Sequence, residues 1–444
     1  MHIVLLATLT LLLASFQSRL LAQAAPESSE LSPSPAEPTV EAPKPKKKKE
    51  KKPKALYYSS LGLGKTLPEG FFRIRAVNRF AQGNKMIDAD GKAENIGYEL
   101  SATASALAIE YGMSDQLSFQ LLAPFVSKNS LAFNKRQFLN SSVAQNQVSK
   151  FQRLLLGNLQ AQGVCPDPTA CNPNQTLGKD IPVMLPTGEI LVLPAAASVG
   201  AALQQVPELV AKNATPADGA TGLGDVDFGI LYSLITQRDQ NLGIGLGIRL
   251  PLGKFQNVPA AQRPTGEGLL MSGIRINYDY QPAAPVWISF QNLSEFVTSS
   301  AKRSKSSLLD PNKLNQADPT SELAIKSGSD GDPNQQTITR KGVGQTGLLR
   351  LDLGLTMFGS FFQPLAFESS LLYRLSAPEY DGDVKKNNGE KRISYQIGGK
   401  FDGLGLNRPF PGYVRILKET FLKGANVGIA TNAVIVEFAV YRSF

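Results

Sequence analysis

The chain has 444 residues, of which 42% are apolar and 19% are charged, with a net charge of +9 and a single histidine, His2. This length accommodates one to three domains, and the apolar fraction is large enough for a folded core, which excludes a wholly disordered chain. Beyond the N-terminus there is no run of about 18 apolar residues, which excludes a protein that crosses a bilayer with helices.

Residues 1–24 are predicted to be a signal peptide. The apolar run from Ile3 to Phe16 precedes a small-residue cleavage pattern that ends at Ala24. An uncleaved anchor is the alternative, although the run is shorter than the roughly 20 residues of a membrane span. Cleavage after Ala24 removes His2, which excludes histidine-based catalysis and imidazole metal sites. We therefore expect no enzyme, no metal and no cofactor.

Residues 25–66 are predicted to form a disordered periplasmic tether, because they are rich in Pro, Ser, Glu and Lys and lack apolar periodicity. The basic part is either a solvated linker or a contact with peptidoglycan or anionic lipid. Nucleic acid is not expected as a partner of an exported chain. The lysines of this basic part are Lys44, Lys46, Lys47, Lys48, Lys49, Lys51, Lys52 and Lys54.

From residue 67 to residue 444 the dominant signal is alternation of apolar with polar or small residues. In the clearest segment, Leu242 to Pro251, every second residue is aliphatic. This period predicts an all-β fold, a transmembrane antiparallel up-and-down β-barrel of about twelve strands. A soluble sandwich shows the same alternation, so a second criterion is needed. The expected strands are 71–80, 97–111, 117–126, 224–236, 242–252, 268–280, 286–297, 346–358, 364–375, 391–402, 412–422 and 433–444.

The lengths of the connections supply that criterion. Tight connections at 112–116, 237–241, 281–285 and 359–363 alternate with long polar ones at 127–223, 253–267, 298–345 and 376–390. Outer-membrane barrels have short periplasmic turns and long extracellular loops. We therefore predict a location in a Gram-negative outer membrane, with both termini periplasmic.

The last strand carries an apolar pattern that ends in phenylalanine. Phe438, Val440 and Phe444 share one face, and this resembles the signature that barrel-assembly machinery reads on outer-membrane barrels. Arg442 stands where an apolar residue is usual; at the membrane interface its head group can reach water. These residues are the predicted insertion signal.

Short motifs resemble outer-membrane barrels associated with the meta-cleavage pathway of phenol degradation, a transporter family distantly similar to fatty-acid and hydrocarbon uptake channels. The resemblance implies uptake of aromatic or hydrophobic compounds. The segments that carry it are Leu67–Gly70, Asp88–Gly91, Glu110–Asp115, Gly222–Gly229 and Gly243–Gly253.

Polar strand positions predict a charged lumen with nine basic and six acidic side chains. Either these select solutes, with a mild preference for anions, or they pair with one another and fill the interior. Arg73, Arg75 and Arg79 form the most promising stripe. The inward glycines around Gly245 either leave space for a solute or permit curvature. The arginine candidates are Arg73, Arg75, Arg79, Arg249, Arg275, Arg350, Arg374 and Arg392.

The connection 127–223 is long enough for structure of its own. Helices are expected over Ser142–Leu159 and Ala195–Lys212, with a hairpin between them that turns at 186–189. Cys165 and Cys171, the only cysteines, are expected to form a local disulfide in an exported protein. We expect a large, partly helical extracellular loop that caps or constricts the pore.

Together these features predict an outer-membrane channel for passive or facilitated uptake of small solutes. The alternative is a structural or surface-interaction barrel that displays its long loops and contacts the cell wall or anionic lipid through the lysine-rich tether.

Overall fold

The computed structural model describes residues 65–167, 171–184, 190–214, 216, 218–237, 239–256, 258, 262–304, 335–385, 388–403, 406 and 410–443. The predicted signal peptide, nearly all of the predicted tether with its lysines, and Phe444 lie outside these residues. None of the helices in this part of the chain combines the length and apolar character needed to cross a membrane.

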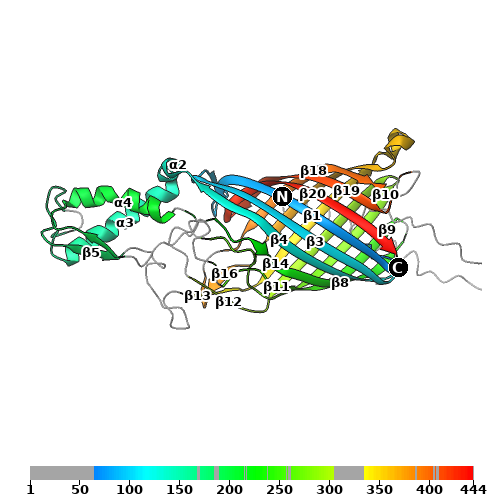
Figure 1. Cartoon of the computed structure of the whole chain (residues 1–444), viewed down its shortest axis with the longest axis horizontal. Coiled ribbons are helices and arrows are strands. Elements are labelled where there is room, and N and C mark those ends of the chain that lie inside the picture. Colours follow the sequence, from blue (N-terminus) through cyan, green and yellow to red (C-terminus); the bar gives the residue numbers. More distant parts are fainter. Residues whose placement is uncertain are drawn as a thin grey trace, which may run out of the picture. The chain divides into compact units, whose positions relative to one another are not determined.

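Twelve antiparallel strands form a closed ring, which confirms the predicted barrel (Figure 1). β1 pairs with β3 on one side and with the last strand, β20, on the other. Closure leaves no unpaired strand edge among the twelve, as a barrel in lipid requires. The strands are β1 (Phe71–Ile87), β3 (Tyr98–Ser114), β4 (Leu117–Phe133), β8 (Val226–Thr236), β9 (Gln240–Leu250), β10 (Met271–Ala283), β11 (Val286–Val297), β14 (Val343–Gly354), β15 (Leu365–Leu375), β18 (Lys391–Asp402), β19 (Gly412–Ala425) and β20 (Val427–Ser443).

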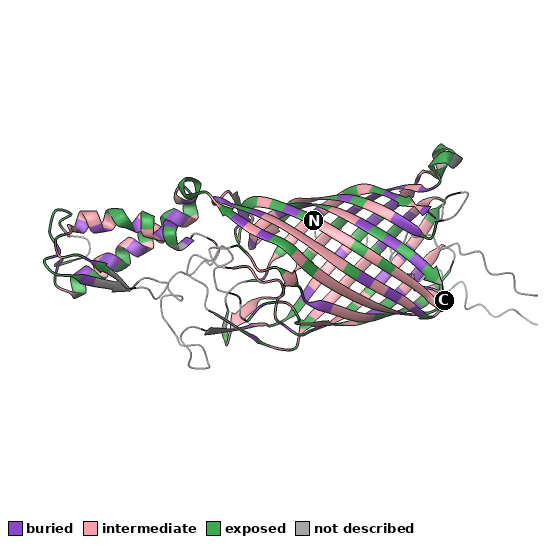
Figure 2. Cartoon of the chain, in the orientation of Figure 1, coloured by how far each residue is buried: buried purple, intermediate pink, exposed green. Residues whose placement is uncertain are grey.

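Exposed and covered residues alternate along the strands (Figure 2). On β9, Ile244, Leu246 and Ile248 are 39%, 54% and 48% exposed, while the residues between them face the lumen. Large apolar side chains recur on the outer face of the other strands, for example Phe438 and Val440 on β20, both about half exposed. The outer surface is therefore apolar, as contact with lipid requires.

The two ends of the barrel differ in their connections. The end that holds the start of β1 and the end of β20 has two- and three-residue turns after β3, β8 and β10, and longer connections at 355–364 and 403–411. The other end has the long connections. Several predicted strand bounds were wrong at this end: β1 and β4 run to 87 and 133 rather than to 80 and 126, and β19 ends at 425 and β20 starts at 427, so only Asn426 joins them. Asn426 has φ 56, a conformation that asparagine tolerates better than most residues.

The long-loop end carries a helical insert between β4 and β8. Its helices and hairpin were predicted, and α2 (Lys135–Leu139) is an addition; the predicted hairpin turn lies outside the described residues. The core of the insert includes Phe138, Phe151 and Leu155, and it continues onto strand residues such as Tyr98, whose hydroxyl donates to the carbonyl of Ala214 at 2.5 Å. The other elements are α3 (Ser142–Ala161), β5 (Ile181–Met184), β6 (Ile190–Leu193) and α4 (Val199–Ala214).

Short elements complete the described fold. β2 extends the edge of β1, and β7 pairs with β4. Four strands from two long connections form a small sheet in the order β12-β13-β16-β17. The bounds are β2 (Ala93–Glu94), β7 (Gly222–Leu223), β12 (Ala301–Ser304), β13 (Gln335–Arg340), β16 (Glu379–Asp381) and β17 (Val384–Lys385), with 3-10 turns η1 (Leu355–Phe358) and η2 (Ser360–Phe362).

Candidate functional site: the barrel lumen

Arginines on β1 enter the lumen and meet glutamates on both neighbouring strands. Arg73 is opposite Glu110 in the β1–β3 register and donates to it through Nε at 2.8 Å. Arg75 lies 2.6 Å from Glu110 and 3.4 Å from Glu437 of β20. The two carboxylates are 3% and 1% exposed, so these are ion pairs largely removed from water. Removing one partner of such a pair leaves a buried charge and is costly.

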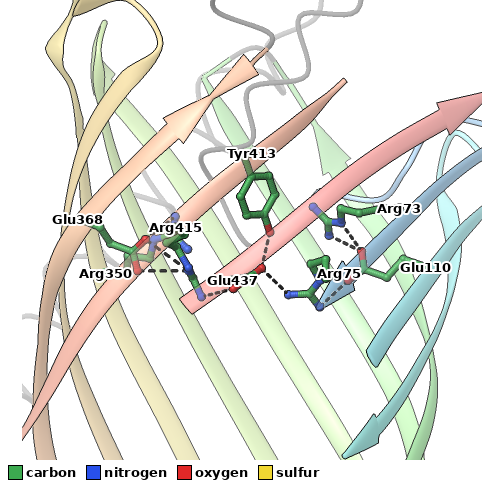
Figure 3. A network of polar contacts seen from close by, with 8 residues as sticks. All are labelled: Arg73, Arg75, Glu110, Arg350, Glu368, Tyr413, Arg415 and Glu437. Carbon is green, nitrogen blue, oxygen red and sulfur yellow. Dashed lines mark hydrogen bonds and ion pairs between the residues drawn. The ribbon is translucent and has the colours of Figure 1, made fainter. Parts of the chain in front are cut away.

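The pairing continues around the wall to β15 (Figure 3). Arg415 on β19 lies 2.6 Å from Glu437 and 3.3 Å from Glu368, and Arg350 on β14 lies 3.4 Å from Glu368. Because each carboxylate is shared, the charges bind neighbouring strands to one another across the ring. We call this set the arginine–glutamate network. Its members are Arg73, Arg75, Glu110, Arg350, Glu368, Arg415 and Glu437, together with Tyr413, whose hydroxyl donates to Glu437.

A second cluster lies on the same side of the wall. Glu419 on β19 accepts from Arg79 at 3.1 Å and from Arg392 at 3.0 Å, and Gln396 donates to the same carboxylate at 3.3 Å. Arg392 also donates to the carbonyl of Thr431 at 2.7 Å. The third arginine of the predicted stripe is therefore ion-paired, like the other two.

Residues 65–68, which precede β1, enter the lumen at the end of the barrel where β1 starts and β20 ends. Thr66 donates to the carbonyl of Asp115 at 2.8 Å and lies 3.2 Å from the Ser233 hydroxyl of β8. Lys65 lies 4.4 Å from the ring centre of Trp287 on β11. A side chain at Gly112 would overlap the carbonyl oxygen of Pro68, so this glycine makes room for the segment. Residues 65–68 therefore narrow this mouth.

The wall formed by β8, β9 and β10 contains a row of inward glycines. Gly229, Gly247 and Gly273 are direct neighbours in the strand register. We call this row the glycine recess. The glycine recess borders a cavity of about 180 Å³, so the inward glycines lie beside open space in the lumen. Arg249 flanks the row and pairs with Asp227 at 2.7 Å and with Glu295 at 3.0 Å.

The connection 251–270 is fastened to the long-loop mouth by Asp225. Its carboxylate accepts backbone N–H groups from Gly253 at 3.0 Å and from Glu267 at 2.6 Å. The Glu267 side chain in turn pairs with Arg340 at 2.5 Å and with Arg374 at 3.4 Å. Asp225 belongs to the glycine-rich segment 222–229, which thus has an identifiable role in closing a loop onto the barrel.

The charge on Glu267 is set by two opposing effects. Burial alone would raise the pKa of this carboxyl, but Arg340, Arg374 and Arg249 outweigh burial and hold the pKa below its usual value. Glu267 is therefore ionised at neutral pH, when it links the connection 251–270 to Arg340 of β13 and to Arg374 of the ring strand β15.

The structure places the eight arginine candidates in or beside the lumen, in separate groups. Arg73, Arg75, Arg79, Arg350 and Arg392 belong to the ion-paired clusters on one side, and Arg249, Arg275 and also Arg75 line the cavity. Arg374 lies at the long-loop mouth. Their role in selecting solutes stays a prediction. Cys165 and Cys171 form the expected disulfide in the insert.

Several lumen residues were not predicted from the sequence as site residues. Glu110, Arg415 and Glu419 all occupy inward positions of predicted strands, so the period of two applied to every charged residue would have found them. Lys65 and Thr66 gave no comparable signal, because they lie in a segment without periodicity.

No protein-family model matches the sequence, and no curated protein matches it. Solved structures are similar in fold. An outer membrane channel from Pseudomonas putida F1 matches with a TM-score of 0.51 at 8% identity, over 85% of this chain and 98% of that chain. The toluene transporter TodX of Pseudomonas putida gives 0.32 at 9% identity, over 84% and 89% of the chains. The β domain of the Bordetella autotransporter Brka gives 0.36 at 10% identity, over 85% and 100%. The chain thus has the fold of a twelve-stranded outer-membrane channel barrel.

Proposed function

We propose that the protein is an outer-membrane channel through which small solutes pass by passive or facilitated diffusion. The observation that carries the proposal is the cavity of about 180 Å³ in a barrel whose outer face is apolar. The cavity is lined by charged groups and by glycines. This lining favours a path for solutes over an interior that is filled by side chains which only support the barrel. Aromatic or hydrophobic compounds are the solute class that the sequence resemblance implies.

We further propose that the end with the termini and short turns is periplasmic. The asymmetry of the connections supports this orientation, since barrels of this kind have short periplasmic turns and long extracellular loops. In this orientation the segment 65–68 narrows the periplasmic mouth. The helical insert and the connection 251–270 then lie at the extracellular mouth.

Purified protein in a planar bilayer tests the channel directly. We expect discrete current steps at fixed voltage and a dose-dependent decrease in current with small aromatic solutes. A difference in gel mobility between the unboiled and the boiled sample first establishes that the protein is a folded barrel. A folded barrel that gives no steps and no solute flux into liposomes would contradict the channel and leave the surface-interaction protein as the better account.

A further inference from the structure

One arginine of the lumen differs from the rest in its partners. Among the lumen-facing arginines that the structure describes, Arg275 on β10 is the one without an ion pair. Its guanidinium donates to the side-chain oxygen of Gln120, and its Nε is buried without a hydrogen-bond partner. A guanidinium offers five donors and matches a carboxylate in a two-bond geometry. Arg275 therefore retains donors for a ligand.

The position of Arg275 is set by the glycines beside it. A Cβ atom at Gly245 would lie 3.3 Å from Nε of Arg275, so the arginine side chain lies across this glycine toward Gln120 on β4. The next inward row along the strands is the glycine recess, which has no side chains. The arginine head group and the open floor are thus adjacent parts of one cavity wall.

The cavity has the size of a single ring and walls of mixed character. Its volume is about 180 Å³, and engineered protein cavities of about 150 Å³ hold benzene. Met271 and Leu293 contribute apolar surface beside the recess. A flat apolar group can therefore lie on the glycine floor, where a side chain would otherwise stand.

Charge is distributed unevenly along this cavity. Near Arg275, the carboxylate of Glu110 is already shared by Arg73 and Arg75. On the other side of the recess, Arg249 is shared by Asp227 and Glu295. The Arg275 side therefore has an excess of positive charge, and a single negative group is favoured there.

We propose that the glycine recess and Arg275 form a binding site for a small monocarboxylate whose remaining part is flat and apolar. The carboxylate displaces Gln120 from the guanidinium, and the apolar part covers Gly229 and Gly247 beside Leu293, whose side chain lies over Gly273. This inference rests on the proposed function, since it names the chemistry of a solute within the same lumen.

Titration calorimetry of the full chain in detergent micelles tests the site without any need for conductance. The probes are benzoate, benzyl alcohol and benzylamine, which share a ring and differ in charge. We expect benzoate to bind at least tenfold more tightly than the other two, and Arg275→Gln to weaken benzoate binding at least tenfold. Gly247→Val keeps the arginine, fills the floor and is expected to weaken benzoate binding to a similar extent.

Arg79→Gln is the matched control, because it removes the same charge from the lumen at a residue that does not line the cavity. Its benzoate affinity should stay within twofold of the parent, and heat-dependent gel mobility confirms that each variant is folded. Equal benzoate affinity in folded Arg275→Gln, or benzyl alcohol binding as tightly as benzoate, would overturn the proposal. Specific benzoate binding in a barrel that does not conduct would refute the channel and retain the site.

Discussion

At the residue scale, the lumen is organised by carboxylates that each serve more than one arginine. Glu110 accepts from two arginines of β1, whereas Glu437 and Glu419 each accept from side chains on two strands. The sequence predicts that such charges face inward, because position along a strand fixes the face. It does not predict the partners, since these depend on which strands are neighbours and on the register between them.

Replacing Glu110 by glutamine should destabilise the barrel by about 3–5 kcal/mol, because Arg73 and Arg75 lose a buried counter-charge. Urea unfolding in detergent, followed by gel mobility, measures the change. Glu208→Gln is the control: its pair with Lys135 is solvent-exposed, and such pairs contribute about 1 kcal/mol or less. Equal unfolding midpoints for the two variants would show that the shared carboxylate does not stabilise the wall.

Acid should loosen the connection 251–270. Glu267 has a pKa below the usual value of about 4.3, so its ionised form stabilises the anchored loop above that pH and the contribution is lost as pH falls through the lowered pKa. Limited proteolysis of the loop between pH 7 and pH 3 measures this. We expect cleavage to increase on acidification in the parent, and Glu267→Gln to be cleaved at all pH values. A loop equally protected at both pH values would refute the anchoring role.

At the element scale, regular segments were predictable and special backbone positions were not. The strand β9 and the helix α3 follow from their periods, because burial on one face constrains every second or every third to fourth residue. The turn at Asn426 depends on a single backbone conformation; Gly424, Asn426 and Gly428 indicate a turn there, but they do not fix its length. The segment 65–68 lies in the lumen because Gly112 leaves room for it, which is a contact between distant parts of the chain.

Replacing Gly112 by alanine should displace the segment 65–68 from the mouth of the barrel. The new methyl group overlaps the backbone of Pro68 and Leu67, so the segment has to move. We expect a larger single-channel conductance, measured in planar bilayers. Gly399→Ala is the matched control, because its Cβ atom would lie 3.7 Å from the nearest backbone oxygen. Conductance that is the same in both variants would mean that the segment does not limit the current.

At the scale of the whole molecule, the ring of strands closes without the helical insert, which packs onto the ends of β1, β3 and β4. The twelve ring strands pair with one another through residues outside 140–212, and β5 and β6 of the insert form a separate sheet. The sequence predicted this division, because a connection with its own helical period and cysteine pair differs from the alternating strands. How far the lumen is filled could not be predicted, since it depends on side chains that meet across the ring.

Deleting residues 140–212 should therefore leave a folded barrel and change its pore. The retained ends, residues 139 and 213, belong to α2 and α4, which contact each other in the insert. We expect heat-dependent gel mobility to persist and conductance to rise, because the insert packs against the ends of β1, β3 and β4. A folded deletion variant with unchanged conductance and unchanged binding to cells would exclude a capping role.

The entry of residues 65–68 into the lumen has a consequence for the order of assembly. These residues are joined directly to β1, and β1 closes the ring by pairing with β20, a strand more than 330 residues away along the chain. Pairings between such distant segments form late, because the intervening chain has to be ordered first. The strand that completes the cylinder therefore carries its own leading segment inward, and closure of the wall and narrowing of the mouth become one folding event.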